Sequence, residues 1–160
     1  MSIPYQRTLA SNASLEGTSL HTGEKVTLTM KPAPPNHGIV FRRIDLEDMP
    51  FIPANVDNVQ QVERATTLAV GSVKVHTVEH VISALAGMEI DNALIEMDAN
   101  EPPIGDGSAA PYVRCIKEAG IVEQEELASV FEIREPIHYE NEDGSIITII
   151  PSKDFRVSCT

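Results

Sequence analysis

The chain has 160 residues, with 12 lysines and arginines against 24 aspartates and glutamates, and a formal net charge of −12. This acidic balance excludes an ordinary nucleic-acid binder, because phosphate binding requires a basic face. With 42% apolar and 22% charged residues, the composition is that of a globular protein. Its longest apolar runs are far shorter than the ~18 residues that a membrane span needs.

Cysteine content and the N-terminal sequence indicate the compartment. The two cysteines, Cys115 and Cys159, form neither a disulfide framework nor a CxxC metal motif. The first seven residues lack the apolar segment of a signal peptide. We therefore expect a reduced, soluble, cytoplasmic protein.

Strands and turns are predicted for the first 75 residues. Residues 25–30 alternate polar and apolar side chains, as a half-buried strand does, and a proline-rich segment follows. Residues 39–44 form a second predicted strand, so the two are expected to pair as a hairpin with a long loop. Residues 66–70 and 72–75 are two short strands joined tightly at Gly71.

The hydrophobic period changes from that of a strand to that of a helix at residue 77. Apolar residues recur at i, i+3, i+4 and i+7, as on the buried face of a helix: Val78, Val81, Ile82 and Leu85. Thr77 is the predicted N-cap and Gly87 the predicted end of this helix. A strand over residues 92–97, a loop, and a second helix over residues 108–119 follow.

The fold class predicted from these elements is α+β, in two domains. Residues 1–122 form the first α+β domain and carry a Glu-His pair, and the acidic residues 123–128 are the expected linker. Residues 129–160 are the expected start of a second, truncated α+β domain, with strands at 130–133, 137–139 and 146–150. Because apolar and polar residues still alternate over 155–160, the chain is expected to stop inside a strand, as a fragment would.

Glu79 and His80 are the strongest candidates for chemistry. They lie opposite the apolar stripe of the first helix, where a solvated polar face is the commoner explanation. The functional alternative is a zinc site, with the imidazole as a ligand and the carboxylate as a general base. The segment His76-Thr77-Val78-Glu79-His80 also fits H-x-x-E-H, the inverted zincin pattern, which requires both histidines on one helical face.

Two loops add further candidates. Residues 17–23 are bounded by glycines and hold His21 at their centre, either as an exposed turn residue or as part of a site. Residues 101–108 form a stiff loop of prolines and glycines before the second helix. Its Asp106 or Ser108 is expected to cap that helix.

Short motifs occur in a fixed order along much of the chain. They are Gln6-Arg7-Thr8-Leu9, Leu20-His21-Thr22-Gly23, Arg64-Ala65-Thr66-Thr67-Leu68, Thr77-Val78-Glu79-His80-Val81-Ile82-Ser83-Ala84-Leu85, Asp91-Asn92 through Ile95-Glu96, and Pro103-Ile104-Gly105-Asp106-Gly107-Ser108-Ala109-Ala110-Pro111. Together they resemble the zinc-dependent UDP-3-O-acyl-N-acetylglucosamine deacetylases of lipid A biosynthesis in Gram-negative bacteria.

The resemblance implies roles for particular residues. His80 would be a zinc ligand, and Glu79 the general base that activates water for attack on the N-acetyl group, which releases acetate. His21 and Thr66 would approach the UDP-linked acylated glucosamine. In the family, a His and an Asp of a later His-Lys-x-x-x-Asp motif complete the zinc ligands, and residues 1–160 contain no such motif; His138 does not fit it.

The resemblance also implies an architecture of two similar α+β domains that clamp the site, in a protein that is a monomer at full length. The present chain would then hold the first domain and the opening strands of the second. Alone, it is expected to bind zinc poorly and to be inactive, because one imidazole cannot hold a four-coordinate ion.

Two alternative functions remain open on the sequence. One is an inverted-zincin-like metallopeptidase that uses His76, Glu79 and His80. The other is a non-catalytic module that pairs its last strand, near Val157, with another chain, because an unpaired strand edge invites such pairing.

Overall fold

The structure is a computed structural model that describes residues 3–62 and 65–160. The chain divides into two compact units, Met1–Ala128 and Ser129–Thr160, and each is described by itself. No helix in these described ranges is long and apolar enough to cross a membrane.

A five-stranded mixed sheet forms the centre of the first unit. Its order is β2 (Ala13–Thr18), β3 (Lys25–Pro32), β9 (Ala93–Met97), β4 (Ile39–Arg43) and β5 (Phe51–Pro53). The alternation predicted for residues 25–30 is confirmed, since Val26, Leu28 and Met30 of β3 are buried. The core of the sheet joins apolar residues of neighbouring strands, as where Met30 lies opposite Ile95.

The hairpin predicted from residues 25–30 and 39–44 is wrong. Strand β9 lies between β3 and β4, antiparallel to the first and parallel to the second. Alternation of polar and apolar residues shows which face of a strand is buried, but it does not show which strand lies beside it. A strand that arrives more than fifty residues later in the chain therefore takes the place next to β3.

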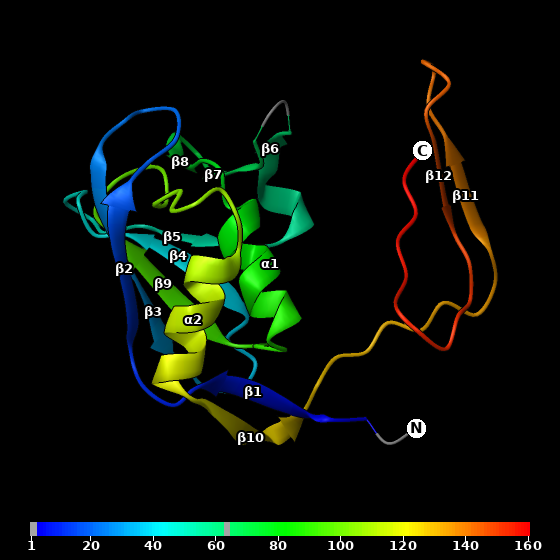
Figure 1. The fold of residues 1–160 in the computed structure, drawn as a ribbon, viewed down its shortest axis with the longest axis horizontal. Helices are drawn as coiled ribbons and strands as arrows, with labels where there is room; N and C mark the ends of the chain where they lie inside the picture. The colour runs from blue at the N-terminus through cyan, green and yellow to red at the C-terminus, as the bar shows by residue number, and fades with distance from the viewer. Residues whose placement is uncertain (1–2, 63–64) are drawn as a thin grey trace. The chain divides into compact units, whose positions relative to one another are not determined.

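Two helices pack on this sheet, and Figure 1 shows them lying over one of its faces. Helix α1 (Glu79–Gly87) buries Val81, Ala84 and Leu85, which confirms the predicted apolar stripe. Helix α2 (Ala110–Ala119) buries Tyr112 and Ile116 and contacts α1 and β2. Sheets with helices packed against them confirm the predicted α+β class.

A small antiparallel sheet lies next to the start of α1 in the sequence. It consists of β6 (Val59–Gln61), β7 (Thr67–Val70) and β8 (Val73–Val75), with a single-turn 3-10 helix, η1 (Val56–Asn58), before β6. The predicted pair joined at Gly71 is confirmed as β7 and β8. Gly71 has a φ of 59°, a conformation that glycine adopts without steric cost.

The first and last strands of this unit pair with each other, and this corrects the expected linker. β1 (Tyr5–Leu9) runs antiparallel to β10 (Ile121–Leu127), so residues 123–127 are part of a sheet. The reason lies in Gln124, whose side chain donates to the carbonyl of Ala33 and accepts a hydrogen bond from Asn92. The glutamates on either side of it are exposed, and their charge is the reason why this segment was predicted to be a linker.

The second unit contains one hairpin, β11 (Ile137–Glu140) paired with β12 (Ile146–Ile149). The predicted turn at residues 141–144 is confirmed, and Gly144 in it has a φ of 83°. The strands predicted at 130–133 and 155–160 are not formed. A strand needs a partner for its backbone groups, and within this unit the described residues pair only β11 with β12. The alternative function of a strand-pairing module was based on a strand near Val157, and the structure does not form that strand.

Candidate active site

The candidate site lies at the N-terminal end of α1, where the chain makes an unusual turn. Helix α1 begins at Glu79, with Val78 as its N-cap residue. Thr77, the predicted N-cap, instead has a φ of 53°, and no side chain caps the helix. The prediction was wrong because the Thr77 hydroxyl is bound elsewhere, to the carboxylate of Glu101 at 2.7 Å. An acidic residue in the first turn, here Glu79, interacts favourably with the helix dipole.

Glu79 is held in place by the backbone of Thr66. The Thr66 N–H donates to Glu79 Oε2 at 2.9 Å, and the Thr66 carbonyl accepts from the N–H of Val78 at 3.2 Å. Within residues 3–62 and 65–160, Glu79 Oε1 makes no hydrogen bond to the protein. The carboxylate is therefore oriented through one oxygen, while the other keeps its capacity to accept a proton.

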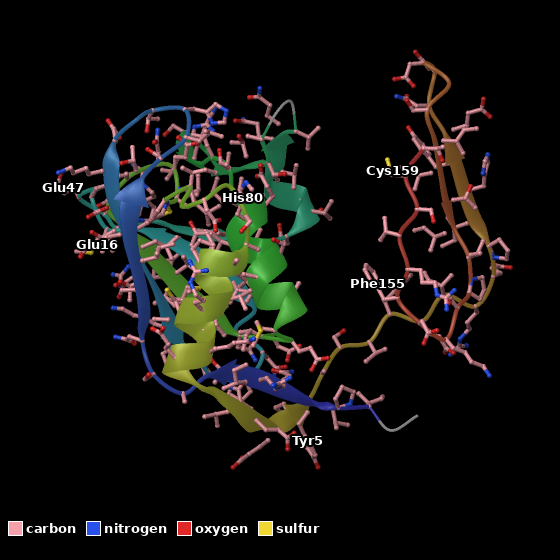
Figure 2. The ribbon with its side chains drawn as sticks, in the orientation of Figure 1. Tyr5, Glu16, Glu47, His80, Phe155 and Cys159 are labelled. Carbon is pink, nitrogen blue, oxygen red and sulfur yellow. The ribbon has the colours of Figure 1, made fainter. Side chains whose placement is uncertain are left out.

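His80 follows Glu79 and is half-buried at the same end of the helix, as Figure 2 shows. Its carbonyl accepts a hydrogen bond from the Ser83 hydroxyl. In the part of the chain that the structure describes, the His80 ring makes no hydrogen bond, so both ring nitrogens keep their capacity to bind. Glu79 and His80 thus share a helix end that is open to a ligand.

His21 is brought to this end of the helix by Glu101. Its Nδ1 lies 2.7 Å from Glu101 Oε1 and 3.3 Å from the hydroxyl of Thr77. The backbone N–H groups of His21 and Thr22 also donate to the Glu101 carboxylate, at 3.0 to 3.2 Å. The loop that carries His21 is therefore held next to Thr77, two residues before Glu79.

Glu101 is fully buried, with none of its surface exposed, and yet favours its charged form. Burial alone raises the pKa of a carboxyl group, but hydrogen bonds from the Thr77 hydroxyl, His21 and the Thr22 backbone outweigh burial, and the pKa of Glu101 lies below its usual value. Glu101 was not among the sequence-predicted site residues. The signal that could have found it is a glutamate before two prolines, four residues after the predicted strand at 92–97, in the loop that was already singled out.

His76 does not share a helical face with His80. It precedes the turn at Thr77, and its Nδ1 lies 2.9 Å from the hydroxyl of Thr67. Burial lowers the pKa of His76, so its neutral form is favoured. The i, i+4 geometry that the H-x-x-E-H pattern requires is absent, because the helix begins only after Thr77.

The remaining site predictions concern the two flanking segments. Asp106 accepts from the N–H and hydroxyl of Ser108, and the Ser108 hydroxyl accepts from the N–H of Ala110, the first residue of α2. The expectation that Ser108 satisfies a free N–H of the helix is confirmed, whereas Asp106 acts within the loop. Arg64, part of a motif in the sequence, lies outside the described residues.

The sequence of the chain is similar to that of a known protein family. A family model for LpxC, UDP-3-O-acyl N-acetylglycosamine deacetylase, matches residues 6–160. The chain belongs to this family. Its deacetylase relatives include those of Myxococcus xanthus and Legionella pneumophila, each 48% identical over 97% of the chain. The bifunctional enzyme LpxC/FabZ of Chlorobaculum tepidum is 46% identical over 96% of the chain.

The LpxC-family relatives are longer than this chain. It spans 49% and 51% of the length of the Myxococcus and Legionella deacetylases, and 33% of the bifunctional enzyme. The match covers both units of the structure, including the hairpin of the second unit.

Proposed function

We propose that this chain is the N-terminal part of a zinc-dependent deacetylase that hydrolyses the N-acetyl group of UDP-3-O-acyl-N-acetylglucosamine and releases acetate in lipid A biosynthesis. The observation that carries the proposal is the pairing of Glu79 with Thr66 beside His80. A carboxylate held by one oxygen, next to an imidazole free of protein partners among the described residues, has the arrangement of a metal-assisted hydrolase.

The donor chemistry at the helix end suits zinc, but the number of donors does not suffice. Imidazole nitrogen is a common zinc ligand, and His80 would supply one. Within the described residues no group of three or more His, Cys, Asp or Glu side chains is placed to hold a metal. The other ligands would come from the rest of the whole protein, where the family places a His and an Asp. When bound, zinc polarises a carbonyl group and lowers the pKa of water to about 7.

Glu79 would act as the general base. Its Oε1 can take a proton from water, while the Thr66 N–H holds Oε2 and prevents the carboxylate from rotating away. In the second half of the reaction the amine of the sugar must gain a proton as the C–N bond breaks. We assign the donor of this proton to the rest of the whole protein, where the family places a later His that serves as general acid.

His21 and Thr66 would contact the substrate from this unit. Both lie beside the start of α1. Glu101 holds His21 there, and the backbone of Thr66 is hydrogen-bonded to Glu79. The whole protein would work in the cytoplasm of a Gram-negative bacterium, as a monomer. The free thiols of Cys115 and Cys159 suit a reducing compartment.

The test compares variants of the whole protein in acetate release from UDP-3-O-acyl-N-acetylglucosamine, with zinc measured by elemental analysis. Glu79→Gln should lower kcat by about 100-fold or more and leave the zinc content unchanged, because general-base catalysis contributes roughly 10²–10⁴-fold. His80→Ala should lose zinc. Glu89→Gln, on the exposed residue after the same helix, is the matched control and should retain full activity. Normal turnover by Glu79→Gln would refute the assignment of the base.

A further inference from the structure

Glu101 is the one fully buried carboxylate of the described residues, and the proposed chemistry does not use it directly. Buried carboxylates are costly unless they are paired and hydrogen-bonded. Glu101 meets this condition with donors from two separate segments: the loop at residues 21–22 and the turn at Thr77. Glu101 therefore joins two segments of the candidate site.

The contact with Glu101 determines which nitrogen of His21 carries a proton. An ionised carboxylate can only accept hydrogen bonds, so the His21 nitrogen that lies 2.7 Å from Oε1 must be a donor. In a neutral imidazole with its proton on Nδ1, the lone pair is on Nε2. The His21 side chain is 49% exposed, so this lone pair is accessible to a ligand.

The same carboxylate oxygen also sets the distance of His21 from the helix. Glu101 Oε1 accepts from both the His21 ring and the Thr77 hydroxyl, each at 2.7 Å. The two donors are 3.3 Å apart, and Thr77 comes two residues before Glu79. Rotation of the His21 ring would break its bond to Glu101, so the ring has one favoured orientation beside α1.

We propose that Glu101 is a positioning residue that holds His21 as the Nδ1–H tautomer, so that Nε2 accepts a hydrogen bond from a hydroxyl or amide N–H of the acylated amino-sugar substrate. The inference rests on the proposed function for the identity of the substrate. The effect of Glu101 on the ring of His21 does not depend on that function and can be measured separately.

The first experiment measures the tautomer of His21 in the 160-residue chain, from the ¹⁵N chemical shifts of the imidazole nitrogens near neutral pH. His21→Gln assigns the signal by its loss. The wild-type ring should be protonated on Nδ1, and Glu101→Gln should shift the population toward the Nε2–H form. Glu24→Gln, which removes the same charge from an exposed position three residues after His21, should leave the tautomer unchanged. An Nε2–H ring in the wild-type chain would overturn the proposal.

The second experiment is a double-mutant cycle in the whole protein, read out as kcat/KM for deacetylation. Glu101→Gln should lower kcat/KM by roughly 10- to 100-fold, the range typical of carboxylates that orient functional histidines. In a His21→Gln background the same change should cost less than about threefold, because the residue through which it acts is gone. An equal loss in both backgrounds would overturn the proposal, since Glu101 would then act independently of His21.

The two readouts separate the failure of this inference from the failure of the proposed function. A folded, zinc-loaded whole protein without deacetylase activity would refute the function, and the tautomer measurement would still decide whether Glu101 orients His21. Glu101→Asp provides a check on folding, because it keeps the charge and should preserve the Nδ1–H tautomer at least in part. A loss of dispersed amide signals in Glu101→Gln alone would show a structural role and count against the proposal.

Discussion

The hydroxyl of Thr77 donates a 2.7 Å hydrogen bond to the fully buried carboxylate of Glu101, and the backbone of Thr77 has a φ of 53°. A β-branched residue at positive φ is strained, by about 1–3 kcal/mol for such conformations. The bond to Glu101 is the contact that offsets this strain and defines where α1 begins.

Thr77→Val should destabilise the first unit by about 1–3 kcal/mol, because a buried charged acceptor loses a donor while the side chain keeps its size. Urea unfolding followed by circular dichroism measures this change. Thr77→Ser, which keeps the hydroxyl and removes the branch at Cβ, should lose much less stability. Equal losses for Val and Ser would show that the hydroxyl is not the stabilising group.

The contribution of Glu101 to stability should depend on pH. Because the folded-state pKa of Glu101 is below its usual value, the carboxylate stabilises the fold at neutral pH, and this contribution is lost as the pH falls through the folded-state pKa. Glu101→Gln should therefore have a lower free energy of unfolding than the wild type, and this gap between the two proteins should be largest above about pH 5. Below about pH 4, where glutamates bind protons, the gap should become smaller. Urea unfolding at several pH values measures the gap. A gap that stays constant down to pH 3 would contradict the assignment.

Asn92 should be essential for the attachment of β1 and β10. It is 1% exposed, and its amide donates to the side chains of Gln6 and Gln124 at 2.8 Å while its oxygen accepts from the N–H of Gly38. Asn92→Leu leaves the buried Gln6 and the half-buried Gln124 and Gly38 without these bonds. It should cost about 3 kcal/mol, the lower end of about 1–3 kcal/mol for each of the three groups, because the half-buried ones can bind water instead.

Hydrogen exchange of the amides of β1 and β10, together with urea unfolding, checks this expectation. The exposed Asn12, changed to Ala, serves as the control and should alter stability by less than about 0.5 kcal/mol. If β1 and β10 kept their protection in Asn92→Leu, the buried amides would not be what holds them.

His76→Ala should leave the zinc content of the whole protein unchanged. His76 lies before the positive-φ turn, its Nδ1 is bound to the hydroxyl of Thr67, and it does not lie one turn from His80 on a helix. Elemental analysis of purified His76→Ala and His80→Ala, side by side, makes the comparison. Loss of zinc from the His76 variant would favour the inverted-zincin alternative.

The parts of the fold that depend on local pattern were predictable from the sequence. The alternation in β3 and the helical spacing from Val78 to Leu85 each follow from burial of one face, and both are confirmed. The neighbour of β3 was not predictable, because pairing with β9 depends on the whole sheet. The role of residues 123–127 was missed because the half-buried Gln124 is held by partners up to 91 residues away, while the charged side chains around it remain exposed.

In the candidate site, too, the features that depend on local sequence were predictable and those that depend on distant contacts were not. Glu79 and His80 are adjacent in sequence, so their residue types and the helical spacing were enough to single them out. Thr77 was taken for an N-cap on its propensity, and a glutamate 24 residues later instead binds its hydroxyl. The sequence around Glu101 drew attention to its loop but not to its hydrogen-bond partners, because these come from segments about 24 and 80 residues away.

The late arrival of β9 affects how the protein is made. At translation rates of 5–20 residues per second, about 3 to 11 s pass between the synthesis of Arg43 and that of Met97. During this interval β3 and β4 lack the strand that covers their facing edges, and Met30 and Phe41 lack the apolar layer that buries them in the finished sheet. The nascent chain would therefore expose two unpaired, aggregation-prone strand edges for several seconds. A chaperone that binds apolar strands would have its largest effect on folding during this interval.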